Sequence, residues 1–240
     1  MFDYARWLQR AEAFVRGLNE LPGQWEISVD VEPPLSVDAA EQLRRTLPLG
    51  LPVSLLGLYT TGSARFQCSY RWSPDEEHLP IIAEVFPHQY TLYGGARFIP
   101  AVELAETQAA VREWAVEWDA PPHGPPRAGW ELWHQCVPFL SVGNGDHLAI
   151  RVRADDQPVL YLCHDAEDAG DGRTAFEISP SFDQFLADWE TLCYVGPEIW
   201  LLARFLADDG NGLLEVDQPI AARWREVIDH FGGFRGATDQ

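Results

Sequence analysis

The chain has 240 residues, of which 46% are hydrophobic and 12% aromatic, and this composition excludes a disordered protein. It carries 37 acidic residues against 17 basic ones, all of them arginine, so its formal net charge is -20. Nucleic acid and anionic membrane surfaces would repel such a chain, and we expect neither as a partner. A basic protein, in contrast, would be attracted to it.

The cysteines and the N-terminus indicate where the chain works. Cys68, Cys136, Cys163 and Cys193 are widely spaced, and residues 1–17 carry charges throughout without the apolar core of a signal peptide. No apolar run approaches the roughly 18 residues that a membrane-spanning helix needs. We therefore expect a protein of the reducing cytoplasm whose cysteines are free, mostly buried thiols.

The first half of the chain alternates between extended and helical patterns. Residues 25–31 and 64–72 alternate strictly between apolar and polar, which predicts half-buried strands. In the second of these, we expect Arg65 and Arg71 on the outer face. Helical spacing and composition predict helices over the following ranges: 4–18, 37–47 after a Ser36 cap, 52–59 and 101–119. The apolar stretches 79–86 and 90–99 are predicted as strands or buried extended segments.

The second half begins with a Pro-rich segment, 120–129, which is either a surface loop or a linker between domains. Short turns then separate extended stretches, so these stretches must be antiparallel neighbours. The extended stretches are 132–142, 146–153 and 158–164. Ser181 is expected to cap a helix, and two helical segments follow near 197–207 and 219–231. Strands grouped by hairpins, with helices apart from them, predict an α+β fold with a mostly antiparallel sheet backed by helices.

One group of residues could bind a metal. His134 and Cys136 share a strand face at the predicted register, and Cys163 and His164 end a neighbouring strand, so the four could form a Cys2His2 zinc site. However, adjacent residues on a strand point to opposite faces, and both Cys163 and His164 could ligate only if the strand ended there. We therefore favour buried thiols beside partly exposed imidazoles. No nucleotide-binding or nucleophile-elbow motif occurs, and we expect no cofactor; the family resemblance described below offers no catalytic residue.

Two acidic features remain. The loop 165–171 gathers Asp165, Glu167, Asp168 and Asp171, which could contact an Arg- or Lys-rich partner or could simply be a solvated loop. Asp146 follows the Asn144-Gly145 turn, and we expect its carboxylate to brace that turn by accepting backbone N–H groups. The alternative, an acid catalyst, lacks an identifiable partner base or nucleophile.

Several motifs, taken in order, resemble the SUKH superfamily of fungal cell-wall synthesis regulators and bacterial toxin-immunity proteins. PPLSVDAAEQLRRTLPLGLPVSLLGLYTTGS (33–63) resembles the family's opening, with Pro34, the Leu51-Pro52 pair and Gly62 at the matching places. VPFLSVGNGDHLAIRV (137–152) and PVLYLCHDAED (158–168) resemble its Asn-Gly-Asp hairpin and the strand that ends in His and acidic residues. ISPSFDQFLADW (178–189) resembles its Ser-Phe-x-x-Phe-Leu helix.

The resemblance implies one SUKH-like domain over 1–240, with a core near 33–195 and a C-terminal helical extension over 197–235. It implies structural roles for the motif residues: Asn144, Gly145 and Asp146 in a turn, and Ser181, Phe182 and Phe185 in a capped core helix. It also implies a non-enzymatic protein that binds a protein partner, of the immunity type that neutralises a toxin. The alternatives are a regulatory module of the cell-wall regulator type and, less favoured, a metal-binding enzyme.

Overall fold

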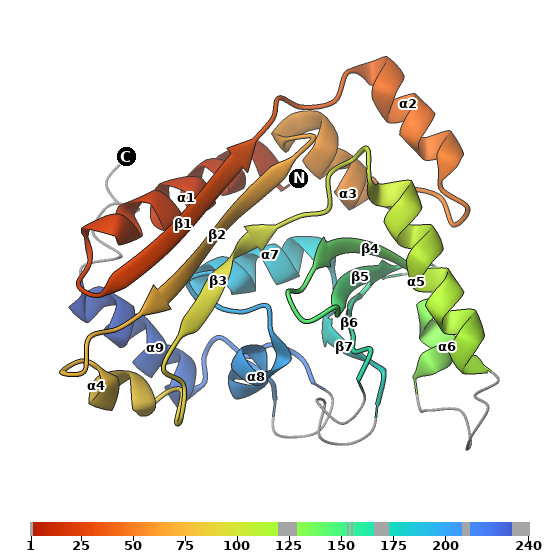
Figure 1. The fold of residues 1–240 in the computed structure, drawn as a ribbon. Coiled ribbons are helices and arrows are strands. Elements are labelled where there is room, and N and C mark those ends of the chain that lie inside the picture. The colour runs from red at the N-terminus through yellow and green to blue at the C-terminus, as the bar shows by residue number, and fades with distance from the viewer. Residues whose placement is uncertain are drawn as a thin grey trace.

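The computed structural model describes residues 2–119, 129–152, 154, 156–165, 173–207 and 212–231, and these form the expected α+β fold (Figure 1). Two antiparallel sheets are present, one of three strands and one of four. Apart from Gly129, the Pro-rich segment 120–129 lies outside the described residues. No helix in the described ranges is long and apolar enough to cross a membrane.

The three-stranded sheet runs in the order β1-β2-β3. Its strands are β1 (Gln24–Val31), β2 (Phe66–Ser73) and β3 (Leu92–Arg97). The alternation that predicted the second strand is confirmed, because Phe66, Cys68, Tyr70 and Trp72 are buried and the residues between them are not. The pairing of β1 and β2 places Trp25 opposite Trp72, and the two indole rings stack with centroids 4.7 Å apart.

Helix α1 (Tyr4–Gly17) covers the inner face of this sheet (Figure 1). Its apolar residues recur at helical spacing, and Trp7, Phe14 and Val15 are buried in the core. The indole of Trp7 donates a hydrogen bond to the carbonyl of Leu186, 179 residues further along the chain. The N-terminal helix therefore belongs to the main core.

The four-stranded sheet is a meander in the order β4-β5-β6-β7. Its strands are β4 (Cys136–Ser141), β5 (His147–Arg151), β6 (Val159–Leu162) and β7 (Ala175–Ser179). Helix α7 (Phe182–Thr191) follows, and the hydroxyl of Ser181 caps it by accepting the N–H of Gln184 at 3.1 Å. Phe182 and Phe185 are buried in the core.

Helices and short helical turns complete the fold (Figure 1). They are η1 (Leu18–Glu20), α2 (Val37–Thr46), α3 (Val53–Gly57), η2 (Leu58–Gly62), α4 (Leu79–Ala83), α5 (Leu104–Asp119), α6 (Trp130–Trp133), α8 (Ile199–Leu202), η3 (Ala203–Phe205) and α9 (Pro219–His230).

Both faces of the four-stranded sheet are covered. Val159 and Tyr161 of β6 point into the main core, which also contains the inner face of the three-stranded sheet. Leu160 and Leu162, which alternate with them, pack into a second cluster with Trp130 of α6 and residues of α5. This arrangement explains why β6 is apolar at every position.

Two segments expected to be extended begin with a helix. Residues 79–83 form α4, and the buried residues Ile82, Val85 and Phe86 have the i, i+3, i+4 spacing of a helical face. The stretch 132–142 likewise starts inside α6, where Trp130 and Trp133 are both buried. His134 therefore follows a helix and does not share a strand with Cys136.

Candidate functional site

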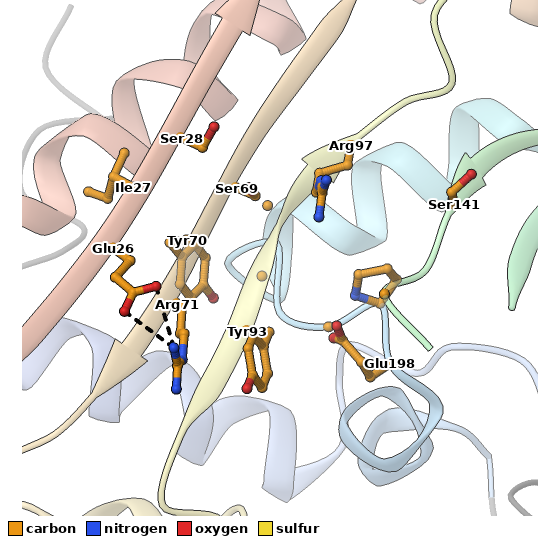
Figure 2. A pocket seen from close by; sticks show the side chains of 15 residues that line it. Glu26, Ile27, Ser28, Ser69, Tyr70, Arg71, Tyr93, Arg97, Ser141 and Glu198 are labelled. Carbon is orange, nitrogen blue, oxygen red and sulfur yellow. Dashed lines mark hydrogen bonds and ion pairs between the residues drawn. The ribbon is translucent and has the colours of Figure 1, made fainter. Parts of the chain in front are cut away.

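A groove of about 290 Å³ lies on the outer face of the three-stranded sheet, where that sheet meets the end of β4 and the segment 194–198 (Figure 2). Polar side chains and glycines line most of it. The residues that border it include Glu26, Ser28, Ser69, Arg71, Tyr93, Gly94, Gly95, Arg97, Ser141, Gly143, Gly196 and Glu198.

Strand alternation explains why these side chains face outward. Because Phe66, Cys68, Tyr70 and Trp72 occupy the inner face, Ser69 and Arg71 must occupy the outer one. The register places Glu26 opposite Arg71, and their side chains form an ion pair of 3.2 Å across the strands. The positive charge of Arg71 is thus already matched.

Close backbone contacts hold the segment 194–198 against β3. The N–H of Gly95 donates to the carbonyl of Tyr194 at 2.6 Å, and the N–H of Gly196 donates to the carbonyl of Tyr93 at 3.0 Å. A Cβ atom on Gly94 would lie 2.5 Å from the carbonyl oxygen of Tyr194, so only glycine permits this approach. The groove is therefore built on a fixed backbone.

The same segment has an uncommon backbone conformation. Cys193 and Tyr194 both have positive φ angles, of 59° and 54°, which non-glycine residues rarely adopt. The N–H of Tyr194 and the indole of Trp189 hold the turn, through bonds to the carbonyls of Trp189 and Val195 respectively. Such strained residues concentrate at functional sites, and here they direct the chain to Glu198.

Among the described residues that line the groove, Glu198 has a buried carboxylate oxygen that lacks a hydrogen-bond donor. Its Oε2 atom is buried and has no hydrogen-bond partner among the described residues. Burial raises the pKa of this carboxyl group, while its own backbone N–H and Arg97 act in the opposite direction. Gly143 borders the carboxylate, and even a Cβ atom there would remain 3.8 Å from Oε1. On the side of Gly143, no side chain of that residue covers the Oε1 atom of Glu198.

The polar surface continues beyond the groove. A second hollow of about 360 Å³ shares Arg97, Ser141 and Gly143 with the first and extends to Glu103. Nearby, Arg65 lies within 4 Å of Asp30, Glu32 and Glu103, in a network of ion pairs. The groove is lined by three serines and by charged side chains, which offer hydrogen-bond donors, acceptors and charges to a bound group.

The predicted turn residues form a separate cluster at the start of β5. Asn144 braces the turn, because its Oδ1 accepts the N–H of Asp146 at 3.1 Å. The carboxylate of Asp146 is buried and reaches to the end of β6 instead, where it accepts the N–H of His164 at 2.8 Å and the hydroxyl of Tyr161 at 2.9 Å. Asp146 also braces its own turn as expected, but by accepting the side-chain amide of Asn144 at 2.8 Å, while the backbone N–H that it accepts belongs to His164.

The four candidate zinc ligands are not brought together. The thiol of Cys136 lies in the second cluster and donates to the carbonyl of Leu132, whereas Cys163 lies in the main core on the opposite face of the sheet. His164 is held by Asp146, and His134 ends α6. The described residues contain no group of three or more side chains suited to hold a metal ion. Burial raises the pKa of Cys136 to about 12, as expected of an inert thiol.

The acidic loop lies mostly outside the description. Asp165 is exposed, while Glu167, Asp168 and Asp171 are not among the described residues. The sequence did not indicate Glu198 or Arg97, although the alternation in 64–72 identified the outer face to which Arg71 belongs. No family model matches the chain, and no curated protein matches it either.

Proposed function

We propose that this protein is a non-enzymatic binding protein of the SUKH immunity type, which neutralises a basic bacterial toxin domain by binding it. The observation that carries the proposal is the net charge of -20 on a folded chain, which is the electrostatic complement of a basic partner. The SUKH-like motifs give the class of protein, and the charge gives the class of partner.

Charge complementarity makes a nuclease toxin the most suitable partner. A nuclease must be basic to hold the phosphates of its substrate, and an acidic inhibitor complements that surface. Barnase and its inhibitor, a standard example of electrostatic steering, associate far faster than neutral proteins do. An excess of 20 negative charges would steer a basic domain in the same way.

Co-expression tests the proposal directly. A basic toxin domain found in a gene beside this one is expressed in a bacterial host, alone and together with the protein, and colony formation is counted; the absence of such a gene would count against the immunity function. We expect the toxin alone to stop growth and co-expression to restore it. An unrelated acidic protein of similar net charge serves as the control and must not rescue. If the toxin killed the host equally with and without the protein, the immunity function would be rejected.

A regulatory module of the cell-wall regulator type would give a different result. Such a protein would have no toxin encoded beside it, and its purified form would bind several native proteins in place of one. Those outcomes would replace the immunity function with the regulatory one.

A further inference from the structure

Resting on the proposed function, we infer that the groove over β3 is the pocket for one arginine or lysine side chain of the basic partner, with Glu198 as the counter-ion. The inference starts from the state of the Glu198 carboxylate. One of its oxygens is buried and has no donor within the described residues, although buried polar atoms are nearly always hydrogen-bonded. Glu198 also lines the groove and is partly exposed, so an ammonium or guanidinium group in the groove would contact the carboxylate and pair with its charge.

The electrostatics favour a cation at this position. Burial raises the pKa of Glu198, because the ionised carboxylate is poorly solvated. A positive charge placed beside it would favour the ionised form and so bind with a charge-assisted hydrogen bond. Arg97 already favours the ionised form, yet the two side chains form no ion pair among the described residues. An incoming cation would therefore be the first ion-pair partner of Glu198 within the described part of the chain.

The groove has the size and lining for a single long side chain. Its volume of about 290 Å³ lies at the lower limit of small-molecule pockets. The half-buried ring of Tyr93 lines the same groove as Glu198 (Figure 2), where it can contact the methylene groups of a bound side chain or the face of a guanidinium. Arg71 does not compete for the carboxylate, because Glu26 holds it.

The first experiment uses a small probe and needs no partner. Nα-acetyl-arginine amide is titrated into the protein with 13C-labelled glutamate carboxyl groups, and the carboxyl resonances are followed by NMR as a function of pH. We expect the Glu198 signal to shift to saturation and its titration to move to lower pH. The Glu198→Gln variant assigns that signal and must lose the response. Glu113→Gln removes an equal charge from the exposed face of α5 and must keep it.

The second experiment uses the toxin domain that the co-expression test identifies. We expect Glu198→Gln to weaken binding at least tenfold and Glu113→Gln to change it by less than twofold. A Glu198 signal that does not respond to the probe, together with unchanged toxin binding by Glu198→Gln, would overturn the pocket while leaving the immunity function intact. Conversely, a probe response in a protein that rescues no toxin would retain the pocket and reject the immunity function. With uniform 13C and 15N labelling, through-bond correlations also assign the Glu198 signal in the wild type, so the titration does not depend on the folding of any variant.

Discussion

Asp146 contacts His164 twice, although the two residues are 18 positions apart. Its Oδ1 accepts the backbone N–H of His164 at 2.8 Å and lies 2.7 Å from ring Nδ1 of the same residue. The other oxygen accepts the hydroxyl of Tyr161 and the side-chain amide of Asn144. One buried carboxylate therefore ties the β4–β5 turn to the end of β6.

The first prediction follows from this satisfied carboxylate. In an Asp146→Asn variant, the amide group would replace one acceptor and face two donors. We expect the free energy of unfolding to fall by about 2–4 kcal/mol, since buried donors would lose their partner. Urea denaturation measures this loss.

Tyr161→Phe is the matched control for this prediction, because it removes only one of the bonds to Asp146. We expect it to cost about 1 kcal/mol. If Asp146→Asn cost no more than Tyr161→Phe, the carboxylate would not be the shared anchor that the geometry indicates.

The neighbouring His147 predicts a dependence of stability on pH. Burial, with a smaller contribution from His164, lowers the pKa of this imidazole to about 4, against the opposing effects of Asp146 and the backbone of Gly145, which favour the protonated ring. In the unfolded chain the imidazole titrates near its ordinary pKa of about 6.5. The unfolded state therefore binds the proton first as the pH falls.

The stability due to neutral His147 is fully present above about pH 6.5 and is lost progressively down to about pH 4, by about 3 kcal/mol in total. Denaturation curves measured at intervals of half a pH unit would show the loss. A His147→Gln variant should lose less stability over this range. If the free energy of unfolding changed with pH in the same way in the wild type and in this variant, His147 would not be the source of the pH dependence.

Removing the N-terminal cap of α7 should destabilise the protein less than Asp146→Asn does. Removing the Ser181 hydroxyl leaves the N–H of Gln184 without its acceptor, and we expect Ser181→Ala to lower the free energy of unfolding by about 1 kcal/mol. Ser36 caps α2 through a longer bond of 3.3 Å, in an exposed helix, so Ser36→Ala should cost less. Thermal denaturation of the two variants compares them. If Ser36→Ala cost more stability than Ser181→Ala, the capping hydrogen bonds would not determine the size of the loss.

Sequence patterns within a single segment predicted those strands and helices whose apolar spacing or capping residue lies inside the segment. The strict alternation in 64–72 identified a strand and its outer face, and the Ser181 position predicted a capped helix. Helices α4 and α6 were missed, because four or five residues span little more than one helical turn and give no lasting period. Their apolar residues were therefore interpreted as parts of extended segments.

The groove could not be predicted for a different reason. It exists because Gly94 and Gly95 of β3 accept the segment after α7 against their backbone, a contact between residues about 100 positions apart. The sequence shows a glycine pair there, which indicates a turn or a bulge but not what approaches it. Glu198 becomes part of a site only through that contact, because no local pattern distinguishes it from the other acidic residues.

Glu198 also gives a prediction that separates binding from stability. Since burial raises the pKa of its carboxyl group, the ionised form is less favourable in the folded protein than in the unfolded chain. Glu198→Gln should therefore be at least as stable as the wild type at pH 8, and its advantage should vanish at low pH, where the wild-type carboxyl is protonated. Urea denaturation at the two pH values checks this. A destabilised variant at pH 8 would mean that the carboxylate holds the fold together.

Association with the toxin domain should depend strongly on salt. Long-range attraction to a chain of net charge -20 is screened once the Debye length falls below about 10 Å, which occurs above roughly 0.1 M salt. We expect the association rate constant to fall roughly tenfold or more between low salt and 0.5 M, while the dissociation rate constant changes far less, because short-range contacts determine it. Stopped-flow mixing measures both. An association rate constant that is the same at all salt concentrations would reject steering by charge, and affinity would then have to come from apolar contacts.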